Sequence, residues 1–212
     1  MFVAFEGMAL AYNIFPVTIY KTRIKDNNFL KEKIISGIEV ALPELDSPEN
    51  WATDNLKTSF EGEPKGKEVL VGKNNVLLKK YYSDAIYEIF DREITWEIAD
   101  DIWYNYYDKG SYQELHEHIA DPFQKIHFSC IHYLSYDKEV HTPAEFQDPI
   151  SSIRAHSLTL DKDFVGDFYI PQVEEGDLIM FPAYLQHRVL PQKVSNVPRI
   201  TLSFNFRLLR YG

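Results

Sequence analysis

The hydrophobic positions near the start of the chain change from a strand pattern to a helical one. Segment 15–24, FPVTIYKTRI, is rich in β-branched and aromatic residues, which favour a strand. In segment 27–42, NNFLKEKIISGIEVAL, the apolar residues Leu30, Ile34 and Ile38 recur every four positions. This spacing places them on one face of a helix, so the segment predicts a helix with an apolar stripe.

A second helix is predicted over 83–93, SDAIYEIFDRE. Ser83 suits the N-cap position, because its hydroxyl can accept a hydrogen bond from a free backbone N–H of the first turn. Ile86, Ile89 and Phe90 then fall on one face. We expect both helices to pack on the outside of a β core.

From residue 96 onward the pattern changes to short apolar runs separated by turn residues such as DKGS, TPAEFQDP and VEEGD. Short strands at such spacing are typical of a sandwich or barrel of jelly-roll type, so a mainly β fold is predicted. We expect a single domain over 1–212, with a supporting part at 1–95 and the β core at 96–212. The predicted strands are 96–107, 125–136, 152–160, 176–182, 187–191 and 199–209.

Composition narrows the choice of partners and of compartment. The formal net charge is −10, and no basic run is denser than KTRIK at 21–25, so nucleic acid is a disfavoured partner. Cys130 is the single cysteine, which excludes an internal disulfide and fits a reducing compartment. The apolar start MFVAFEGMALAY lacks a basic region and contains Glu6, so it is interpreted as a first strand region rather than a signal peptide. We expect a cytoplasmic protein without a membrane span, acting on a small molecule or a peptide; a homodimer is compatible with this.

Histidines supply the first candidate chemistry. His116 and His118 are separated by one residue, and on a strand residues i and i+2 face the same way. His187 follows the buried strand of GDLIMFP and is a candidate third ligand. Three imidazoles on one side of a metal leave positions open opposite, as a catalytic site requires. His127, His141 and His156 are interpreted as surface or hydrogen-bonded residues, the ordinary roles of histidine.

The last predicted strand carries a second candidate. In PRITLSFNFRLL, Arg199 heads a polar face that alternates with the apolar residues of the other face. Thr201, Ser203 and Asn205 continue this polar face, which contains no acidic residue. An arginine that points into a barrel needs an anionic partner, because burying an unpaired charge is costly. A bound carboxylate would satisfy it, and an ion pair with a surface acid is the alternative.

Taken in order, these motifs resemble the 2-oxoglutarate/iron(II)-dependent dioxygenases, which have a double-stranded β-helix fold. The series is N-x-Y-x-x-G-x5-H-x-H, then SCIHYL, then GDLIMFP…H, then R-x-T-x-S-F-N, over roughly residues 96 to 209. The resemblance implies that His116 and His187 are iron ligands. It also implies that Arg199 binds the far carboxylate of 2-oxoglutarate.

Further cosubstrate contacts are implied by the same resemblance. Asn105 and Tyr107 match an Asn-x-Tyr pair of the alkylation-repair members, and Tyr133 matches a carboxylate-binding tyrosine of the prolyl hydroxylases. Thr201 matches the hydroxyl of the R-x-S pattern, and Ser203 follows it on the same face.

One position departs from the usual H-x-D…H triad. His118 stands where the family usually has Asp, although a group of its oxygenases with H-x-H-P-like segments also carries His there. We therefore expect His118 to be the third metal ligand.

The implied function is a hydroxylase that uses Fe(II) and 2-oxoglutarate and forms succinate and CO₂ while oxidising a substrate C–H bond. Two alternatives stay open at this stage. One is a cupin-like metal enzyme that does not use 2-oxoglutarate, and the other is a non-catalytic β-sandwich binding module.

Overall fold

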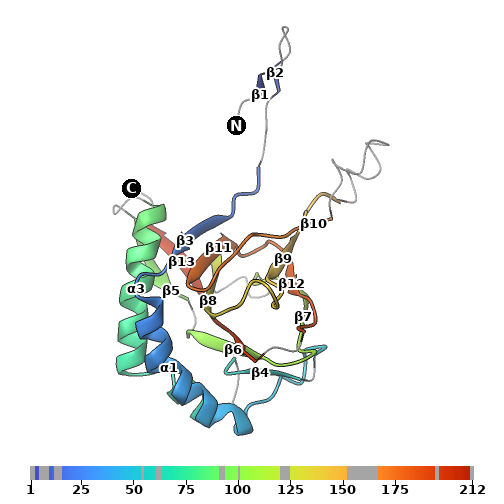
Figure 1. The fold of residues 1–212 in the computed structure, drawn as a ribbon. Coiled ribbons are helices and arrows are strands. Elements are labelled where there is room, and N and C mark those ends of the chain that lie inside the picture. Colours follow the sequence, from blue (N-terminus) through green and yellow to red (C-terminus); the bar gives the residue numbers. More distant parts are fainter. Residues whose placement is uncertain are drawn as a thin grey trace.

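The computed structural model describes residues 3–4, 10–11, 16–53, 55–60, 64–90, 94–99, 101–119, 125–151, 167–193 and 196–210. Two antiparallel sheets lie face to face, and helices cover the outer side of the larger sheet (Figure 1). A separate pair of short strands, β1 (Val3–Ala4) and β2 (Leu10–Ala11), lies within the predicted first strand region.

The larger sheet has seven strands, and β13 lies at its centre. The order is β3-β11-β8-β13-β6-β4, and β5 pairs with the far end of β13. These strands are β3 (Tyr20–Arg23), β4 (Leu56–Thr58), β5 (Thr95–Ile98), β6 (Trp103–Tyr107), β8 (Phe128–Ser135), β11 (Asp177–Pro182) and β13 (Arg199–Arg210). β3 and β4 come from the first half of the chain, so both halves build this sheet.

The smaller sheet faces the inner side of the larger one. Its order is β10-β9-β12-β7, with the bounds β7 (Gln113–His116), β9 (Ala144–Gln147), β10 (Phe168–Tyr169) and β12 (His187–Val189). An apolar core fills the space between the sheets: Tyr133 and Phe181 of the larger sheet meet Phe146 and Val189 of the smaller. This is the mainly β, double-stranded β-helix architecture that the sequence predicts.

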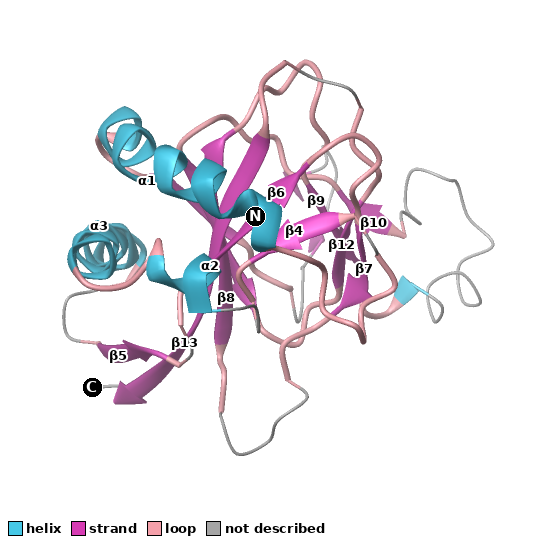
Figure 2. Ribbon diagram, turned by 90° about the horizontal axis from the view of Figure 1, so that it is seen from below, coloured by secondary structure: helices cyan, strands magenta, loops and turns pink. Residues whose placement is uncertain are grey.

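The outer side of the larger sheet is covered by helices (Figure 2). They are α1 (Asn27–Ala41), α2 (Pro64–Glu68) and α3 (Lys73–Ile89), and the short 3₁₀ helix η1 (Leu42–Glu44) follows α1. The predicted stripe Leu30, Ile34 and Ile38 of α1 is fully buried in a second core between helices and sheet. Burying each such side chain stabilises the fold by about 1.5–3 kcal/mol.

Strand β13 serves both cores through its alternation. Ile200, Leu202, Phe204 and Phe206 all belong to the core under the helices. Residues of opposite parity therefore face the inner side, toward the smaller sheet. The predicted separation of a polar from an apolar face on this strand is confirmed.

The second predicted helix was placed too late in the chain. α3 begins at Lys73, with Gly72 at the N-cap, so Ser83 is an internal helical residue and not a cap. Its hydroxyl donates to the carbonyl of Lys79, one turn earlier, at 2.7 Å. The exposed polar residues of the first turns hide the helical period there, which is why pattern alone misses this start.

Two predictions in the β region need correction, and one lies outside the described residues. Segment 96–107 is not one strand: β5 ends at Ile98, β6 begins at Trp103, and the two pair with opposite ends of β13. Part of the predicted turn 142–149 is strand β9, because Ala144 and Phe146 are buried in the core. The predicted strand at 152–160 is not among the described residues.

The other predicted strands are confirmed with small changes of their bounds in β8, β11, β12 and β13, whereas the strand predicted at 15–24 is shortened to Tyr20–Arg23 in β3. The turn VEEGD before β11 is also confirmed: Gly176 has a φ of 87°, in the left-handed region that favours glycine. A Cβ there would lie 3.1 Å from Cβ of Asn27. In the described ranges, no helix combines the length and the apolarity needed to cross a membrane.

Candidate active site

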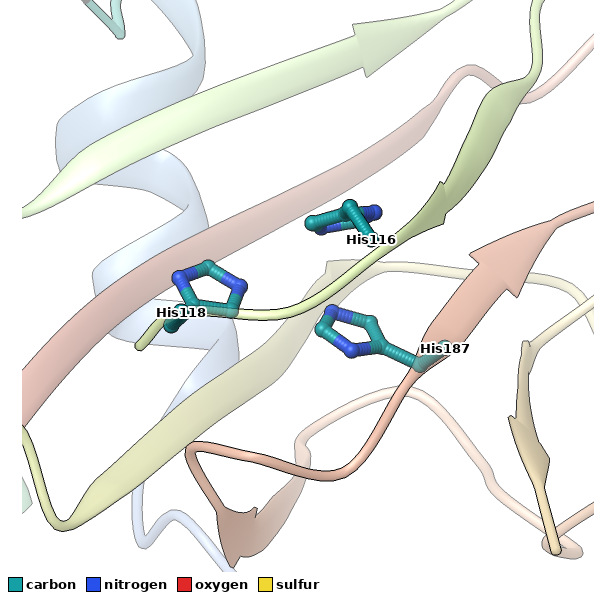
Figure 3. Close-up of side chains that lie close together, drawn as sticks. All are labelled: His116, His118 and His187. Carbon is teal, nitrogen blue, oxygen red and sulfur yellow. The ribbon is translucent and has the colours of Figure 1, made fainter. Parts of the chain in front are cut away.

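Three histidines converge at one end of the space between the sheets. His116 ends β7 and His187 begins β12, and the two residues are direct partners across these antiparallel strands. His118 lies just beyond the end of β7. Figure 3 shows the three imidazoles turned toward one another. The candidate ligand atoms all lie within 4.8 Å of one another, so the structure brings the three predicted ligands together.

Backbone carbonyls orient two of the rings. Nδ1 of His116 is 2.8 Å from the carbonyl oxygen of Glu114, and Nδ1 of His187 is 3.1 Å from that of Leu185. A carbonyl only accepts, so each Nδ1 must carry the proton and donate it. Nε2 of both rings then carries the lone pair that a metal needs, although in His116 it accepts a hydrogen bond from the amide of Gln113 in this structure. A carbonyl that accepts from Nδ1 in this way commonly orients a metal-binding histidine.

Desolvation keeps all three imidazoles neutral. The loss of hydration lowers the pKa of His116, and it lowers that of His187 well below its usual range. The pKa of His118 falls to about 3, first through desolvation and then through the nearby His116. Neutral imidazole is the form that binds a metal, so the cluster is ready for a cation at ordinary pH.

Packing holds the other parts of the cluster. The backbone N–H of His118 donates to the carbonyl of Ala183 at 2.9 Å, which fixes the chain after β7 ends. The His118 ring stacks on Trp103, with 6.1 Å between centroids, and the edge of Phe181 packs on His187 at 4.6 Å. These aromatic neighbours limit the ring orientations and exclude water from one side of the cluster.

Arg199 is buried in the same cavity without an anionic partner. It is only 1% exposed, and its Nε and Nη1 atoms have no hydrogen-bond partner in the part of the chain that the structure describes. Its guanidinium carbon lies 4.0 Å from the ring centroid of Tyr107 and 5.7 Å from that of Tyr133. These cation–π contacts stabilise the charge only in part, so two buried donors remain available to a ligand.

The other predicted residues gather around Arg199 because β13 lies between β6 and β8. Thr201 is paired with Asn105 on one side and with Tyr133 on the other. Asn105 accepts a hydrogen bond from the hydroxyl of Thr58 at 2.7 Å, which orients its amide. A narrow cavity of about 20 Å³ is lined by all three histidines and by Asn105, Tyr107, Arg199, Thr201 and Ser203. Tyr133 is fully buried next to this lining rather than part of it.

Both tyrosines near Arg199 remain protonated. Burial raises the pKa of Tyr107 and of Tyr133, and the positive charge of Arg199 opposes that rise in each case. The Tyr107 hydroxyl donates to Oε1 of Gln113 at 3.2 Å. The hydroxyl oxygen of Tyr133 accepts from the backbone N–H of Ala144 at 3.1 Å, so its own proton is free for another acceptor.

Gln113 is a lining residue that the sequence did not indicate. It lies three positions before His116, so strict alternation would place the two on opposite faces. The pairing of β7 with β12 is irregular, however: His187 faces His116 while Val189 faces Gln113. This extra residue brings Gln113 into the cavity, where its Nε2 lies 3.3 Å from Nε2 of His116.

His127 and His141, which the sequence assigned to ordinary roles, lie apart from the three-histidine cluster. Nε2 of His141 bonds to the carbonyl of Val197 at 2.9 Å, and Nδ1 of His127 accepts from the backbone of Leu208 at 3.0 Å. His156 lies outside the described residues.

The fold and this site define a class: a double-stranded β-helix protein with three histidines at one end of its core and an arginine buried beside them. Residues 101–205 match the family described as "Putative 2OG-Fe(II) oxygenase". Over this region the chain is similar to the 2-oxoglutarate/iron(II)-dependent oxygenases, enzymes whose cofactors are Fe(II) and 2-oxoglutarate. The resemblance carried by the sequence motifs is thereby confirmed.

Two solved structures are similar to the chain in fold. A Pseudomonas putida prolyl-4-hydroxylase is 14% identical, with a TM-score of 0.51 and coverage of 92% of this chain and 94% of that one. An oxidoreductase of the 2OG-Fe(II) oxygenase family from Burkholderia pseudomallei is 13% identical, with a TM-score of 0.52 and coverage of 81% and 77%. No curated protein matches the chain in sequence.

Proposed function

We propose that the protein hydroxylates a C–H bond of its substrate, that His116, His118 and His187 hold its Fe(II), and that Arg199 anchors 2-oxoglutarate. The observation that carries this proposal is that a neutral three-histidine cluster and a buried arginine without an anionic partner line one cavity. Succinate and CO₂ are the products expected from the cosubstrate.

The donor set fits iron. Imidazole nitrogen suits Fe(II), and three ligands on one side leave positions for a cosubstrate and O₂. His118 replaces the usual carboxylate, so the protein itself adds no negative charge to the metal. An anionic cosubstrate is then favoured electrostatically, because it neutralises both the metal and Arg199.

The pocket around Arg199 fits a carboxylate. A guanidinium donates charge-assisted hydrogen bonds to a carboxylate, and Nε and Nη1 are two buried donor atoms without a partner among the described residues. Thr201 and the free proton of Tyr133 add hydroxyl donors near the same end. Asn105 and Tyr107 form the wall between this end and the histidines.

The division of labour follows from these positions. When bound, the iron and 2-oxoglutarate supply the oxidising chemistry, which no side chain of the protein provides. The histidines orient their Nε2 lone pairs, and Arg199 with its hydroxyl neighbours aligns the cosubstrate. Trp103 packs against the ring of His118 and Phe181 against that of His187, which limits the orientations of both imidazoles.

The two alternative functions leave parts of the site without a role. In a metal enzyme of cupin type that does not use 2-oxoglutarate, the two unsatisfied donors of buried Arg199 would cost stability and have no ligand to bind. A binding module without a metal would desolvate three histidines together, which costs stability. The proposed function accounts for both features.

Metal and cosubstrate binding test the proposal separately. We expect His116→Ala and His187→Ala each to abolish binding of one Fe(II) or Co(II) per chain, measured anaerobically, and the exposed His127→Ala to retain it. Arg199→Met should weaken 2-oxoglutarate binding by about ten- to a thousandfold, because a bidentate charged contact is lost, while metal binding is kept. Full metal occupancy in both histidine variants would overturn the metal site.

His118 needs its own test, because it is the ligand that departs from the family pattern. We expect His118→Ala to change the visible ligand-field spectrum of the Co(II) protein, since an imidazole leaves the metal. His118→Asp should still bind metal, but less tightly, because the shorter side chain does not reach as far. An unchanged Co(II) spectrum in His118→Ala would remove this residue from the coordination sphere.

Substrate, domain and compartment belong to the same proposal. The Pseudomonas putida neighbour is a prolyl-4-hydroxylase, so peptidyl proline should be included in a substrate screen that measures succinate formation.

β3 and β4 join the C-terminal strands in one sheet, which supports treating 1–212 as a single domain. Buried Cys130 and a ferrous cofactor both suit a reducing, cytoplasmic setting.

A further inference from the structure

A cleft of about 780 Å³ opens beside the histidine cluster. It shares Trp103 and His118 with the narrow cavity, so a molecule held in the cleft would border the metal site on the His118 side. The charged residues of its lining are Lys67 of α2, Lys79 of α3, Asp101 before β6 and Glu117 after β7. A cleft of this size accommodates a small molecule or a few residues of a peptide.

The two lysines differ from many other lysines of this acidic protein. Lys21, Lys25, Lys31, Lys57 and Lys138 each form an ion pair. Lys67 and Lys79, by contrast, have no ion-pair partner among the described residues, and both are exposed at the cleft. On the helix side of the cleft, these two cations are available to an anionic group of a ligand.

The two acidic residues of the cleft balance the formal charge of the lysines, but they belong to other segments of the chain. Glu117 accepts a hydrogen bond from the side-chain amide of Gln186 at 3.1 Å. Asp101 belongs to the strand side of the cleft, whereas the lysines come from the helices. A ligand with an anionic end at the helices could also place an N–H donor near Asp101.

Aromatic side chains connect the outer part of the cleft with the histidines. Trp51 stacks on Phe60 with 5.7 Å between ring centroids, and Phe60 lies 5.1 Å from Trp103. Trp103 in turn stacks on His118. Of this row, Phe60 and Trp103 line the cleft and offer an apolar surface for the body of a ligand.

We infer that the primary substrate carries an anionic group, a carboxylate or a phosphate, which Lys67 and Lys79 bind while the apolar part lies along Phe60 and Trp103. This inference rests on the proposed function, since it assigns the cleft to the substrate of the same site. It makes the two lysines specificity-determining residues rather than catalytic ones. Because both lysines are exposed, added salt should weaken the binding.

Matched probes test the charge preference without knowledge of the natural substrate. Phenylacetate, phenylacetamide and phenyl phosphate share an aromatic body and differ in charge. Their binding is followed by NMR on protein saturated with Zn(II) and 2-oxoglutarate, which fill the inner site, and again on the metal-free protein. We expect the two anions to shift the Trp103 indole signal and to bind about tenfold more tightly than the amide. The ratio between the two anions distinguishes a carboxylate site from a phosphate site.

Charge reversal assigns the preference to particular residues. The double variant Lys67→Glu/Lys79→Glu should lose the preference for the anions, whereas Lys80→Glu, on the same helix but outside the cleft lining, should keep it. Equal affinity for acid and amide, or a preference that survives the double variant, would overturn the inference. Binding of Zn(II) and 2-oxoglutarate is measured in every variant. If these fail to bind while the anion preference persists, the proposed function is wrong and the cleft assignment stands.

Discussion

Gln113 shows how a single side chain can link the two halves of the site. Its amide lies between Nε2 of His116, at 3.3 Å, and the hydroxyl of Tyr107, at 3.2 Å. Tyr107 in turn packs on the guanidinium of Arg199. The amide therefore stands between the metal end and the carboxylate end of the cavity, where a neutral group is compatible with an anionic cosubstrate.

A negative charge at this position should oppose the cosubstrate. We expect Gln113→Glu to weaken 2-oxoglutarate binding by about tenfold or more, because its carboxylate would face a dianion in a poorly hydrated cavity. Metal binding should persist, because the new carboxylate would lie near Nε2 of His116 and a negative charge there attracts a metal cation. Calorimetry with the Co(II) protein in the absence of O₂ measures both. Gln113→Leu, which removes the amide without adding charge, is the control and should show the smaller loss.

At the scale of elements, a buried histidine connects two helices to the sheet. His132 of β8 is fully buried, and its Nε2 donates to Oδ1 of Asn27, the first residue of α1, at 2.8 Å. Its Nδ1 accepts from the hydroxyl of Tyr82 in α3, at 3.2 Å. Asn27 also donates to the carbonyl of Leu134 at 3.1 Å. In the neutral form both ring nitrogens are satisfied.

This arrangement makes stability depend on pH in a defined direction. Burial lowers the pKa of His132 to about 3, so between the ordinary value of 6.5 and about 3 the unfolded chain binds a proton that the folded protein does not. The free energy of unfolding should therefore fall as the pH falls through this window. The contribution of His132 to the slope is at most about 1.4 kcal/mol per pH unit.

Replacing His132 should flatten this dependence. We expect His132→Gln to be less stable than the original at pH 7, because hydrogen bonds to α1 and α3 are lost, but to lose less further stability between pH 6.5 and 4. Urea unfolding of the metal-free protein at several pH values measures the slope. His127→Gln, at an exposed position, should leave the slope unchanged. Parallel curves for His132→Gln and the original protein would contradict the assignment.

At the scale of the whole molecule, the ligands of the site should stabilise the fold. The histidines come from β7, β12 and the segment after β7, whereas Arg199 begins β13 of the larger sheet. A metal and a carboxylate ligand bound here hold both sheets and have no comparable site in the unfolded chain.

We expect Zn(II) and 2-oxoglutarate each to raise the free energy of unfolding by about 2.7 kcal/mol at a free concentration of 100 times the dissociation constant. A chelator should reverse both gains. In Arg199→Met the gain from the metal should remain and the gain from 2-oxoglutarate should largely disappear, which thermal unfolding with and without each ligand can show. Stabilisation by 2-oxoglutarate that does not depend on Arg199 would place its binding site elsewhere.

Local patterns in the sequence determined those features that depend on near neighbours along the chain. The four-residue spacing of Leu30, Ile34 and Ile38 defined the buried face of α1, and alternation along 199–209 defined which side chains of β13 share a face. The order and spacing of the histidines and of Arg199, through their resemblance to a known family, also sufficed to indicate candidate residues that the structure brings into one cavity.

Tertiary structure decided the features that depend on contacts between distant segments. Gln113 lies in the cavity because the pairing of β7 with β12 is irregular. Segment 144–147 forms strand β9 because Phe146 packs in the core between the sheets. Lys67 and Lys79 line the same cleft as His118 because α2 and α3 contribute to its walls. Alternation and helical periodicity describe how a segment faces its own neighbours. They carry no information on which distant segment will lie opposite, and that choice depends on the packing of the whole chain.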